Sequence, residues 1–189
     1  MKTPRFIVVE GLDGTGKSTI AKQLAESLDY QYKKTPSDTF QKARSYFDVP
    51  EISTLERISF YLADCLKLSM QVQTNEELFL VVDRYFYSTL AYHLEQDPDL
   101  TRCFEPLVKN LRKPDLVILL HTDFEISRRR IQERSATASY EDKFLNREAF
   151  QRIFNNYLEL IDAPKLIIEN SGTVEETLER IIQEIRTRL

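Results

Sequence analysis

The sequence predicts an α/β fold in which a five-stranded parallel sheet is flanked by helices. Short, nearly continuous apolar runs at residues 6–10, 78–83, 115–121 and 165–170 have the composition of strands that are covered on both faces. A more polar run at 30–35 predicts a weaker strand at an edge of the sheet. Longer stretches with helical spacing separate these runs, and this alternation is typical of right-handed βαβ units.

Helices are predicted where apolar residues recur every three or four positions, because that spacing places them on one face. Such stretches occur at residues 18–28, 55–69, 150–161 and 174–185. Pairs that combine Ser or Thr with a Glu three residues later predict helix starts at Ser53 with Glu56, Thr122 with Glu125, and Thr173 with Glu176. We interpret the apolar stripes of these helices as core packing.

Composition indicates a single globular domain over residues 1–189. Hydrophobic residues make up 42% and charged residues 30%, and the formal net charge of −4 argues against a nucleic acid polymer as a partner. No apolar run approaches the roughly 18 residues of a membrane span. Cys65 and Cys103 lie far apart, which argues against a disulfide framework or a zinc site and favours a reduced, cytoplasmic protein. The polar segment 132–146 is predicted to be a mobile lid.

A phosphate-binding motif follows the first predicted strand. Residues 11–18, GLDGTGKS, fit the pattern G-x-x-x-x-G-K-[ST] in full and open a helical stretch. Backbone N–H groups of such a loop point at phosphate oxygens, Lys17 reaches the β- and γ-phosphates, and Ser18 binds Mg²⁺. The residues predicted to bind ATP from this segment are Gly11, Asp13, Gly14, Thr15, Gly16, Lys17, Ser18 and Thr19.

A second constellation ends the third strand in chain order. Ligands of open α/β sheets bind at the carboxyl ends of strands, so Asp83 is expected beside the phosphate loop as a Mg²⁺ ligand, and Arg84 where two anionic substrates meet. The chain has no Asn-Lys-x-Asp motif for guanine, no glycine three residues after Asp83, and no transporter-type signature loop. A kinase that phosphorylates a small acceptor is therefore favoured over a GTPase switch or a transport ATPase.

These segments resemble the thymidylate kinase family. The resemblance rests on residues 6–19, FIVVEGLDGTGKST, on the pattern DRYxxSxxAY at residues 83–92, and on KPDL at residues 113–116, in order and spacing over most of the chain. It implies a homodimeric nucleoside monophosphate kinase that uses ATP and Mg²⁺, with dTMP as the leading acceptor. Alternatives are a kinase for another nucleotide, nucleoside or small molecule, and a nucleotide-binding regulatory protein, against which the intact Lys17, Ser18 and Asp83 argue.

The resemblance also implies roles for individual residues. Asp13 would lie near the acceptor sugar, Lys34 in the loop with Pro36 would hold the acceptor phosphate together with Arg84, and Tyr61 would stack on the base. Arg130 and Arg134 would face ATP, and Lys17, Arg84 and Arg134 would neutralise the transferring group. The residues expected at the acceptor are Asp13, Lys34, Pro36, Tyr61, Asp64, Cys65, Arg84, Ser88 and Tyr92.

Two departures from the family pattern fall in the expected acceptor site. Lys34 stands where the family has an arginine, and lysine lacks the two-pronged contact with phosphate. Cys65 stands where an arginine would contact the thymine edge, while the neighbouring Asp64 would accept from an exocyclic amine. These residues lead to the hypothesis that dTMP is a weak substrate or is displaced by another acceptor, and the alternative is that the departures are tolerated and dTMP is the ordinary acceptor. His93 and His121 are interpreted as structural.

Overall fold

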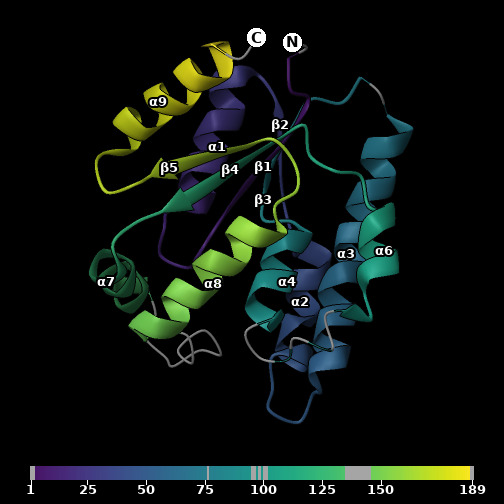
Figure 1. The fold of residues 1–189 in the computed structure, drawn as a ribbon. Helices are drawn as coiled ribbons and strands as arrows, with labels where there is room; N and C mark the ends of the chain where they lie inside the picture. Colours follow the sequence, from purple (N-terminus) through teal and green to yellow (C-terminus); the bar gives the residue numbers. More distant parts are fainter. Residues whose placement is uncertain are drawn as a thin grey trace.

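The computed structural model describes residues 3–75, 77–94, 97, 99, 102–134 and 146–187 of the chain. Five strands form one sheet in the order β2-β3-β1-β4-β5, and each strand is parallel to its neighbours (Figure 1). The strands are β1 (Phe6–Gly11), β2 (Gln31–Lys34), β3 (Leu80–Asp83), β4 (Leu116–His121) and β5 (Lys165–Glu169). The predicted α/β class, the five parallel strands and the edge position of the polar strand are confirmed.

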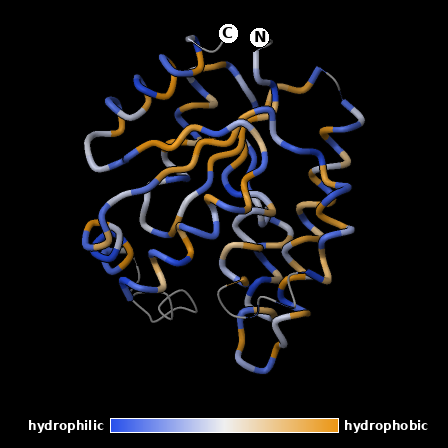
Figure 2. Tube along the Cα trace, viewed as in Figure 1, coloured by the Kyte–Doolittle hydropathy of each residue, from blue (hydrophilic) through white to orange (hydrophobic). Residues whose placement is uncertain are grey.

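Two layers of helices cover the sheet (Figure 1). One core packs Ile7 and Val9 of β1 against α1 and α9, and the other packs Phe6 and Val8 against α3, α4 and α8. Figure 2 shows long hydrophobic runs through the centre of the sheet, whereas the edge strand β2, with the sequence QYKK, is hydrophilic. The helices are α1 (Lys17–Leu28), α2 (Asp38–Phe47), α3 (Thr54–Thr74), α4 (Phe86–Leu94), α6 (Glu105–Asn110), α7 (Phe124–Arg134), α8 (Arg147–Leu160) and α9 (Val174–Thr187). None of the helices described here is both long and apolar enough to cross a bilayer.

Strand register brings the predicted site segments to one edge of the sheet. Asp83 at the end of β3 lies opposite Val9 of β1 and Lys34 of β2, and Gly11 lies opposite Leu120 of β4. Because all five strands run in one direction, their carboxyl ends share this edge. The loops that follow β1, β2 and β3 therefore meet there.

The predicted capping hydrogen bonds are present at two of the three predicted helix starts, and at the third a different residue caps the helix. Ser53 accepts from the Glu56 N–H at 3.3 Å and donates its own N–H to the Glu56 carboxylate at 2.9 Å. Thr173 and Glu176 make the same pair of bonds at α9. At α7 the Glu125 N–H donates to Asp123 Oδ1 at 2.7 Å, so the predicted Thr122 cap is wrong: the carboxylate one residue later occupies that position.

The predicted lid lies only partly within the described structure. Residues 132–134 form the last turn of α7, and Asn146 caps α8 by accepting from the Ala149 N–H at 2.8 Å. Residues 135–145 lie outside the described residues. The lid therefore stays a prediction.

Candidate active site

Glycines shape the loop between β1 and α1. Gly14 has φ +77°, and a Cβ atom there would overlap the carbonyl oxygen of Ser127 on α7. Gly11 has φ +141°, and a Cβ atom there would overlap the carbonyl oxygen of Leu120 on β4. Only glycine permits both the backbone angles and these close approaches. The loop is consequently held between two elements that are distant in sequence.

Side chains from the far half of the chain anchor the same loop. Asn170, at the end of β5, donates to the Thr15 carbonyl at 2.7 Å and accepts from the Thr177 hydroxyl at 2.8 Å. Ser127 donates to the Asp13 carbonyl. Arg130, predicted at ATP, lies on the loop with Nη1 3.3 Å from the Gly14 carbonyl oxygen. The position of Asn170 after an apolar strand was the signal that could have identified this anchor.

Lys17 is buried at the start of α1. Its Nζ donates to the Leu12 carbonyl at 2.5 Å and lies 3.8 Å from Asp13 Oδ1. Burial lowers the pKa of Lys17 to about 8, with the nearby Arg84 charge acting in the same direction, although Asp13 opposes both. In this arrangement the ammonium group is bound by the loop itself. Thr19 is exposed in the first turn of α1, and Arg134 ends α7 with its side chain outside the described part.

The Ser18 hydroxyl and the Asp83 carboxylate form a pair suited to Mg²⁺. Ser18 donates to Asp83 Oδ2 at 2.5 Å, whereas the buried Oδ1 atom has no hydrogen-bond partner among the described residues. A buried carboxylate oxygen without a partner is costly, and oxygen donors suit Mg²⁺, which keeps waters and phosphates as further ligands. The residues present therefore fit a magnesium ion. The described residues contain no cluster of three or more His, Cys, Asp or Glu that would form an all-protein metal cage.

Asp13, Arg84 and Tyr92 join the phosphate loop to α4. Arg84 has a left-handed φ of +68° and donates Nη2–H to Asp13 Oδ1. Tyr92 donates to Asp13 Oδ2 at 2.9 Å and accepts from the Asp13 N–H at 3.0 Å. Burial alone would raise the pKa of Asp13, but the Arg84 and Lys17 charges and these hydrogen bonds lower it to about 2. This carboxylate stays ionised and fixes the direction of the Arg84 guanidinium.

A buried network behind these residues was missed in the sequence. Glu10 accepts from the Tyr85 N–H at 2.8 Å and from the Ser88 hydroxyl at 2.5 Å. The Ser88 oxygen lies 2.9 Å from the Tyr157 hydroxyl on α8, which donates to the Gly11 carbonyl at 3.2 Å. The network links the phosphate loop, α4 and α8. A glutamate inside an apolar strand was the available signal.

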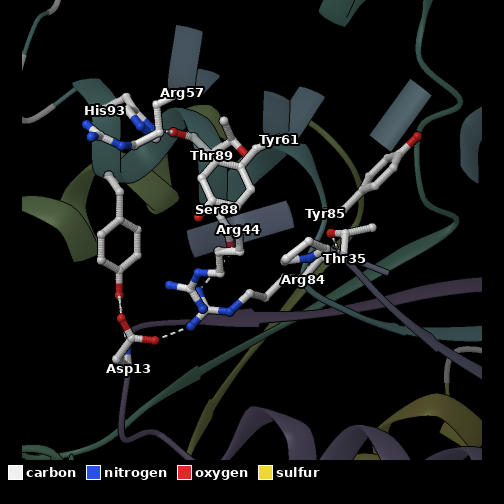
Figure 3. A pocket seen from close by; sticks show the side chains of 12 residues that line it. Asp13, Thr35, Arg44, Arg57, Tyr61, Arg84, Tyr85, Ser88, Thr89 and His93 are labelled. Carbon is white, nitrogen blue, oxygen red and sulfur yellow. Dashed lines mark hydrogen bonds and ion pairs between the residues drawn. The ribbon is translucent and has the colours of Figure 1, made fainter. Parts of the chain in front are cut away.

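A cavity of about 120 Å³ that is partly continuous with solvent adjoins Asp13 and Arg84; we call it the Tyr61 cavity (Figure 3). Its lining residues are Asp13, Thr35, Pro36, Arg44, Arg57, Tyr61, Arg84, Tyr85, Ser88, Thr89, Tyr92 and His93. The structure thus brings together the predicted Asp13, Pro36, Tyr61, Arg84, Ser88 and Tyr92. Sequence reasoning missed the roles of Arg44, Arg57, Thr89 and His93 in this lining.

The remaining residues expected at the acceptor lie elsewhere. Lys34 and Asp64 line a second space of about 690 Å³ that also reaches Ser18 and Asp83. Lys34 Nζ is 3.1 Å from Asp38 Oδ1, and Asp64 accepts from the Ser37 N–H and hydroxyl at 2.5 and 2.8 Å. Cys65 lines neither space, because it is buried with Sγ 4.0 Å from Thr35 Oγ1, and burial raises its thiol pKa.

Two other arginines reach the Tyr61 cavity. Arg44 on α2 donates Nε–H to Asp48 at 2.5 Å, and the Tyr61 hydroxyl donates to the same carboxylate at 2.8 Å. Arg57 on α3 is buried and donates to the Val49 carbonyl at 2.8 Å. Guanidinium groups of Arg44 and Arg57 therefore line this cavity, although position 65, where the family has an arginine, is a cysteine.

Comparisons with known proteins agree with this architecture. The family model described as thymidylate kinase matches residues 9–181. The probable thymidylate kinase of Thermococcus kodakarensis is 33% identical over 205 aligned residues, covering 97% of this chain and 98% of that protein. The thymidylate kinase of Brachyspira hyodysenteriae is 29% identical, with 85% and 86% covered.

Solved structures share the fold. A thymidylate kinase from Candida albicans superposes with a TM-score of 0.78 at 22% identity, covering 98% of this chain and 92% of that one. A deoxyadenosine kinase from M. mycoides with bound dATP gives a TM-score of 0.76 at 20% identity, covering 96% and 99%. These likenesses establish the common fold.

Proposed function

The chain belongs to the thymidylate kinase family of nucleoside monophosphate kinases, and from this premise we propose that it transfers the γ-phosphoryl group of ATP to dTMP. The observation that carries the proposal is the meeting of two half-sites at one edge of the sheet. The phosphate loop of residues 11–18 and the Tyr61 cavity adjoin there, and they share Asp13. The products are dTDP and ADP.

In the donor half-site, the loop holds the phosphates of ATP through its backbone N–H groups and the first turn of α1. Lys17 exchanges the Leu12 carbonyl for the β- and γ-phosphate oxygens, and Arg130 lies beside the same loop. Ser18 and Asp83 hold Mg²⁺, which supplies positive charge to the phosphates. The support for this arrangement is the buried Lys17 and the unpartnered Asp83 oxygen.

In the acceptor half-site, the Tyr61 cavity takes the sugar and base, and Arg84 binds the acceptor phosphate. Asp13 and Tyr92 fix the guanidinium of Arg84 so that it faces the phosphate loop. A phosphate acceptor is already ionised near neutral pH, so no side chain has to remove a proton. Catalysis then consists of positioning and of charge neutralisation by Lys17, Arg84 and, as a proposal from the family pattern, Arg134.

The test is an ADP-release assay with dTMP, dUMP, dCMP, dGMP, dAMP and free thymidine as acceptors. We expect kcat/KM for dTMP to exceed that for the other acceptors by about a hundredfold or more, because losing one polar contact from a buried base edge costs orders of magnitude. A different preferred acceptor would favour the alternative suggested by Lys34 and Cys65. ATP binding without ADP release on any acceptor would indicate a regulatory nucleotide-binding protein and contradict the proposal.

We also propose that the enzyme works as a homodimer in the cytoplasm, where ATP and dTMP are both available. The support for the dimer is an apolar set on the outer face of α3. Leu55, Leu66 and Met70 are all exposed in the single chain. Their spacing of eleven and four residues places them on one side of the helix.

A further inference from the structure

His93 contributes a buried imidazole to the wall of the Tyr61 cavity. The side chain belongs to α4 and is 4% exposed. In Figure 3 it lies with Arg57 on the side of the cavity away from Asp13. The Tyr61 ring centroid is 6.4 Å from that of the imidazole. This side of the cavity is where the base of a bound nucleotide lies if Arg84 holds its phosphate.

The hydrogen-bond partner of His93 fixes its tautomer. Nδ1 lies 2.6 Å from the Thr89 carbonyl oxygen, which can only accept, so Nδ1 carries the proton. Burial lowers the pKa of His93, and the Arg57 charge on α3 adds to this, although the Thr89 bond and Asp48 oppose it. The ring is neutral near neutral pH, and Nε2 therefore holds a lone pair.

That lone pair is unused. Nε2 is buried and has no hydrogen-bond partner among the described residues. Because Nδ1 points back to the carbonyl of its own helix, Nε2 lies on the edge of the ring turned away from the α4 backbone. A buried acceptor without a donor is destabilising, and a ligand N–H placed there removes that cost.

We propose that His93 Nε2 is the hydrogen-bond acceptor that reads a ring N–H of the acceptor base and thereby selects a 2,4-dioxopyrimidine over cytosine. The proposal rests on the proposed function and adds the residue that sets its base preference. Thymine and uracil carry N3–H between two carbonyl oxygens, whereas N3 of cytosine has a lone pair that would face the lone pair of Nε2. The cationic Arg57 on the same side favours carbonyl oxygens over an exocyclic amine.

The first experiment uses the wild-type enzyme with dTMP and with 3-deaza-dTMP, in which N3–H is replaced by C–H. We expect kcat/KM to fall by about tenfold or more for the analogue, mainly through KM, because Nε2 is left without a donor. Equal values for dTMP and the analogue overturn the proposal whatever happens to any variant. A wild-type enzyme that releases no ADP with any monophosphate overturns the proposed function, and the His93 assignment with it.

Variants separate base reading from a structural role. In His93→Phe the ratio of kcat/KM for dTMP to that for 3-deaza-dTMP should fall to about one, whereas His93→Gln, which retains an acceptor oxygen, should restore part of it. His121→Phe is the matched control and should keep the wild-type ratio. A wild-type ratio in folded His93→Phe contradicts the proposal. If that variant does not fold, the pH profile decides.

The pH profile follows from the lone pair. As the pH falls through the lowered pKa of His93, Nε2 gains a proton, so the wild-type ratio should decrease toward one. The charged groups that act on His93 are Arg57, which lowers its pKa, and Asp48, which raises it. His93→Gln should show a flat ratio. The assignment is contradicted if the wild-type ratio does not change with pH and is the same as the ratio for His93→Gln.

Discussion

Glu10 brings a carboxylate to the fully buried point where β1 meets the start of α4. It accepts from the Tyr85 N–H at 2.8 Å, the Ser88 N–H at 3.3 Å and the Ser88 hydroxyl at 2.5 Å. Burial nevertheless raises the pKa of Glu10 to about 7, because the charged form loses its water and the hydrogen bonds offset only part of that loss. The residue therefore titrates near neutral pH in the folded protein.

The first prediction concerns stability and pH. In the unfolded chain Glu10 has a pKa of 4.5, so between 4.5 and about 7 the folded state retains a proton that the unfolded state releases. This contribution to stability is fully present below pH 4.5 and is lost as the pH rises through 7. Urea unfolding should show that the wild type loses about 2 kcal/mol relative to Glu10→Gln between about pH 5.5 and about pH 8.5.

Glu159→Gln, at an exposed position of α8, is the control for this prediction. Its free energy of unfolding should follow the wild type at both pH values. If Glu10→Gln also followed the wild type, the assignment of a near-neutral pKa to Glu10 would be refuted.

The second prediction at this scale concerns Lys17. Lys17→Ala should lower kcat by about a thousandfold, because a cation that stabilises the transferring phosphoryl group contributes several kcal/mol. In the free protein its hydrogen bond to Leu12 and its ion pair with Asp13 both lie within the loop, so the circular dichroism spectrum should stay that of the wild type. Lys109→Ala, on the exposed surface of α6, should retain wild-type kcat. Turnover within tenfold of wild type would rule out the role given to Lys17.

At the scale of elements, β1, β3 and β4 were predictable because each is a short apolar run covered on both faces. The expectation that β5 is also covered on both faces is wrong, because it lies at the edge of the sheet opposite β2 and alternates buried and exposed residues. The helix starts at Ser53 and Thr173 were predictable because capping is local, and the start of α7 was wrong because the Asp123 carboxylate competes with Thr122. Local patterns contain no information on which elements meet. Arg44, Arg57 and His93 come from three different helices, and only packing brings them to one cavity.

Two roles transferred by sequence position lack support in the structure. Lys34 lines the second space and does not line the Tyr61 cavity, whereas the next residue, Thr35, lines both. On α3, Tyr61 lines the cavity, but one turn later Cys65 lies beneath Thr35. Matching by sequence position gives the element correctly and leaves the side of the element undetermined.

The third prediction tests the packing of α7 on the phosphate loop. In Gly14→Ala the new Cβ atom overlaps the Ser127 carbonyl oxygen, and the φ of +77° is strained for alanine. We expect a loss of about 2 kcal/mol or more in the free energy of unfolding, together with at least about a tenfold weaker binding of ATP. Thermal unfolding and calorimetric titration measure the two effects.

Gly172→Ala is the matched control for Gly14→Ala. Gly172 does not have a positive φ, and its added Cβ atom meets only the flexible carboxylate end of Glu176. The control should lose less stability and bind ATP as the wild type does. Equal losses in the two variants would show that the close approach of α7 does not determine the loop position.

At the scale of the molecule, the two half-sites are linked by side chains from both ends of the chain. Tyr157 on α8 contacts Ser88, which lines the Tyr61 cavity, and the Gly11 carbonyl of the phosphate loop. The helix that carries it begins directly after the segment predicted to be a lid. A change in the position of α8 would therefore alter the Tyr157 contacts with Ser88 and with the Gly11 carbonyl, one in each proposed half-site.

The last prediction concerns assembly through α3. Leu55, Leu66 and Met70 are 48%, 37% and 58% exposed, and the exposed Ala63 lies between them on the same side of the helix. A patch on one helix face can pack against the same patch of a second copy across a two-fold axis. Each apolar residue of the patch is then buried in both subunits. In sedimentation velocity we expect the wild type to be the proposed dimer and Met70→Asp to be a monomer, because each interface of the variant would bury two unpaired carboxylates. Ile167→Asp, which alters a similarly exposed apolar residue on β5, should leave the dimer intact. A monomeric wild type, or a Met70→Asp variant as dimeric as the wild type, would refute assembly through this face.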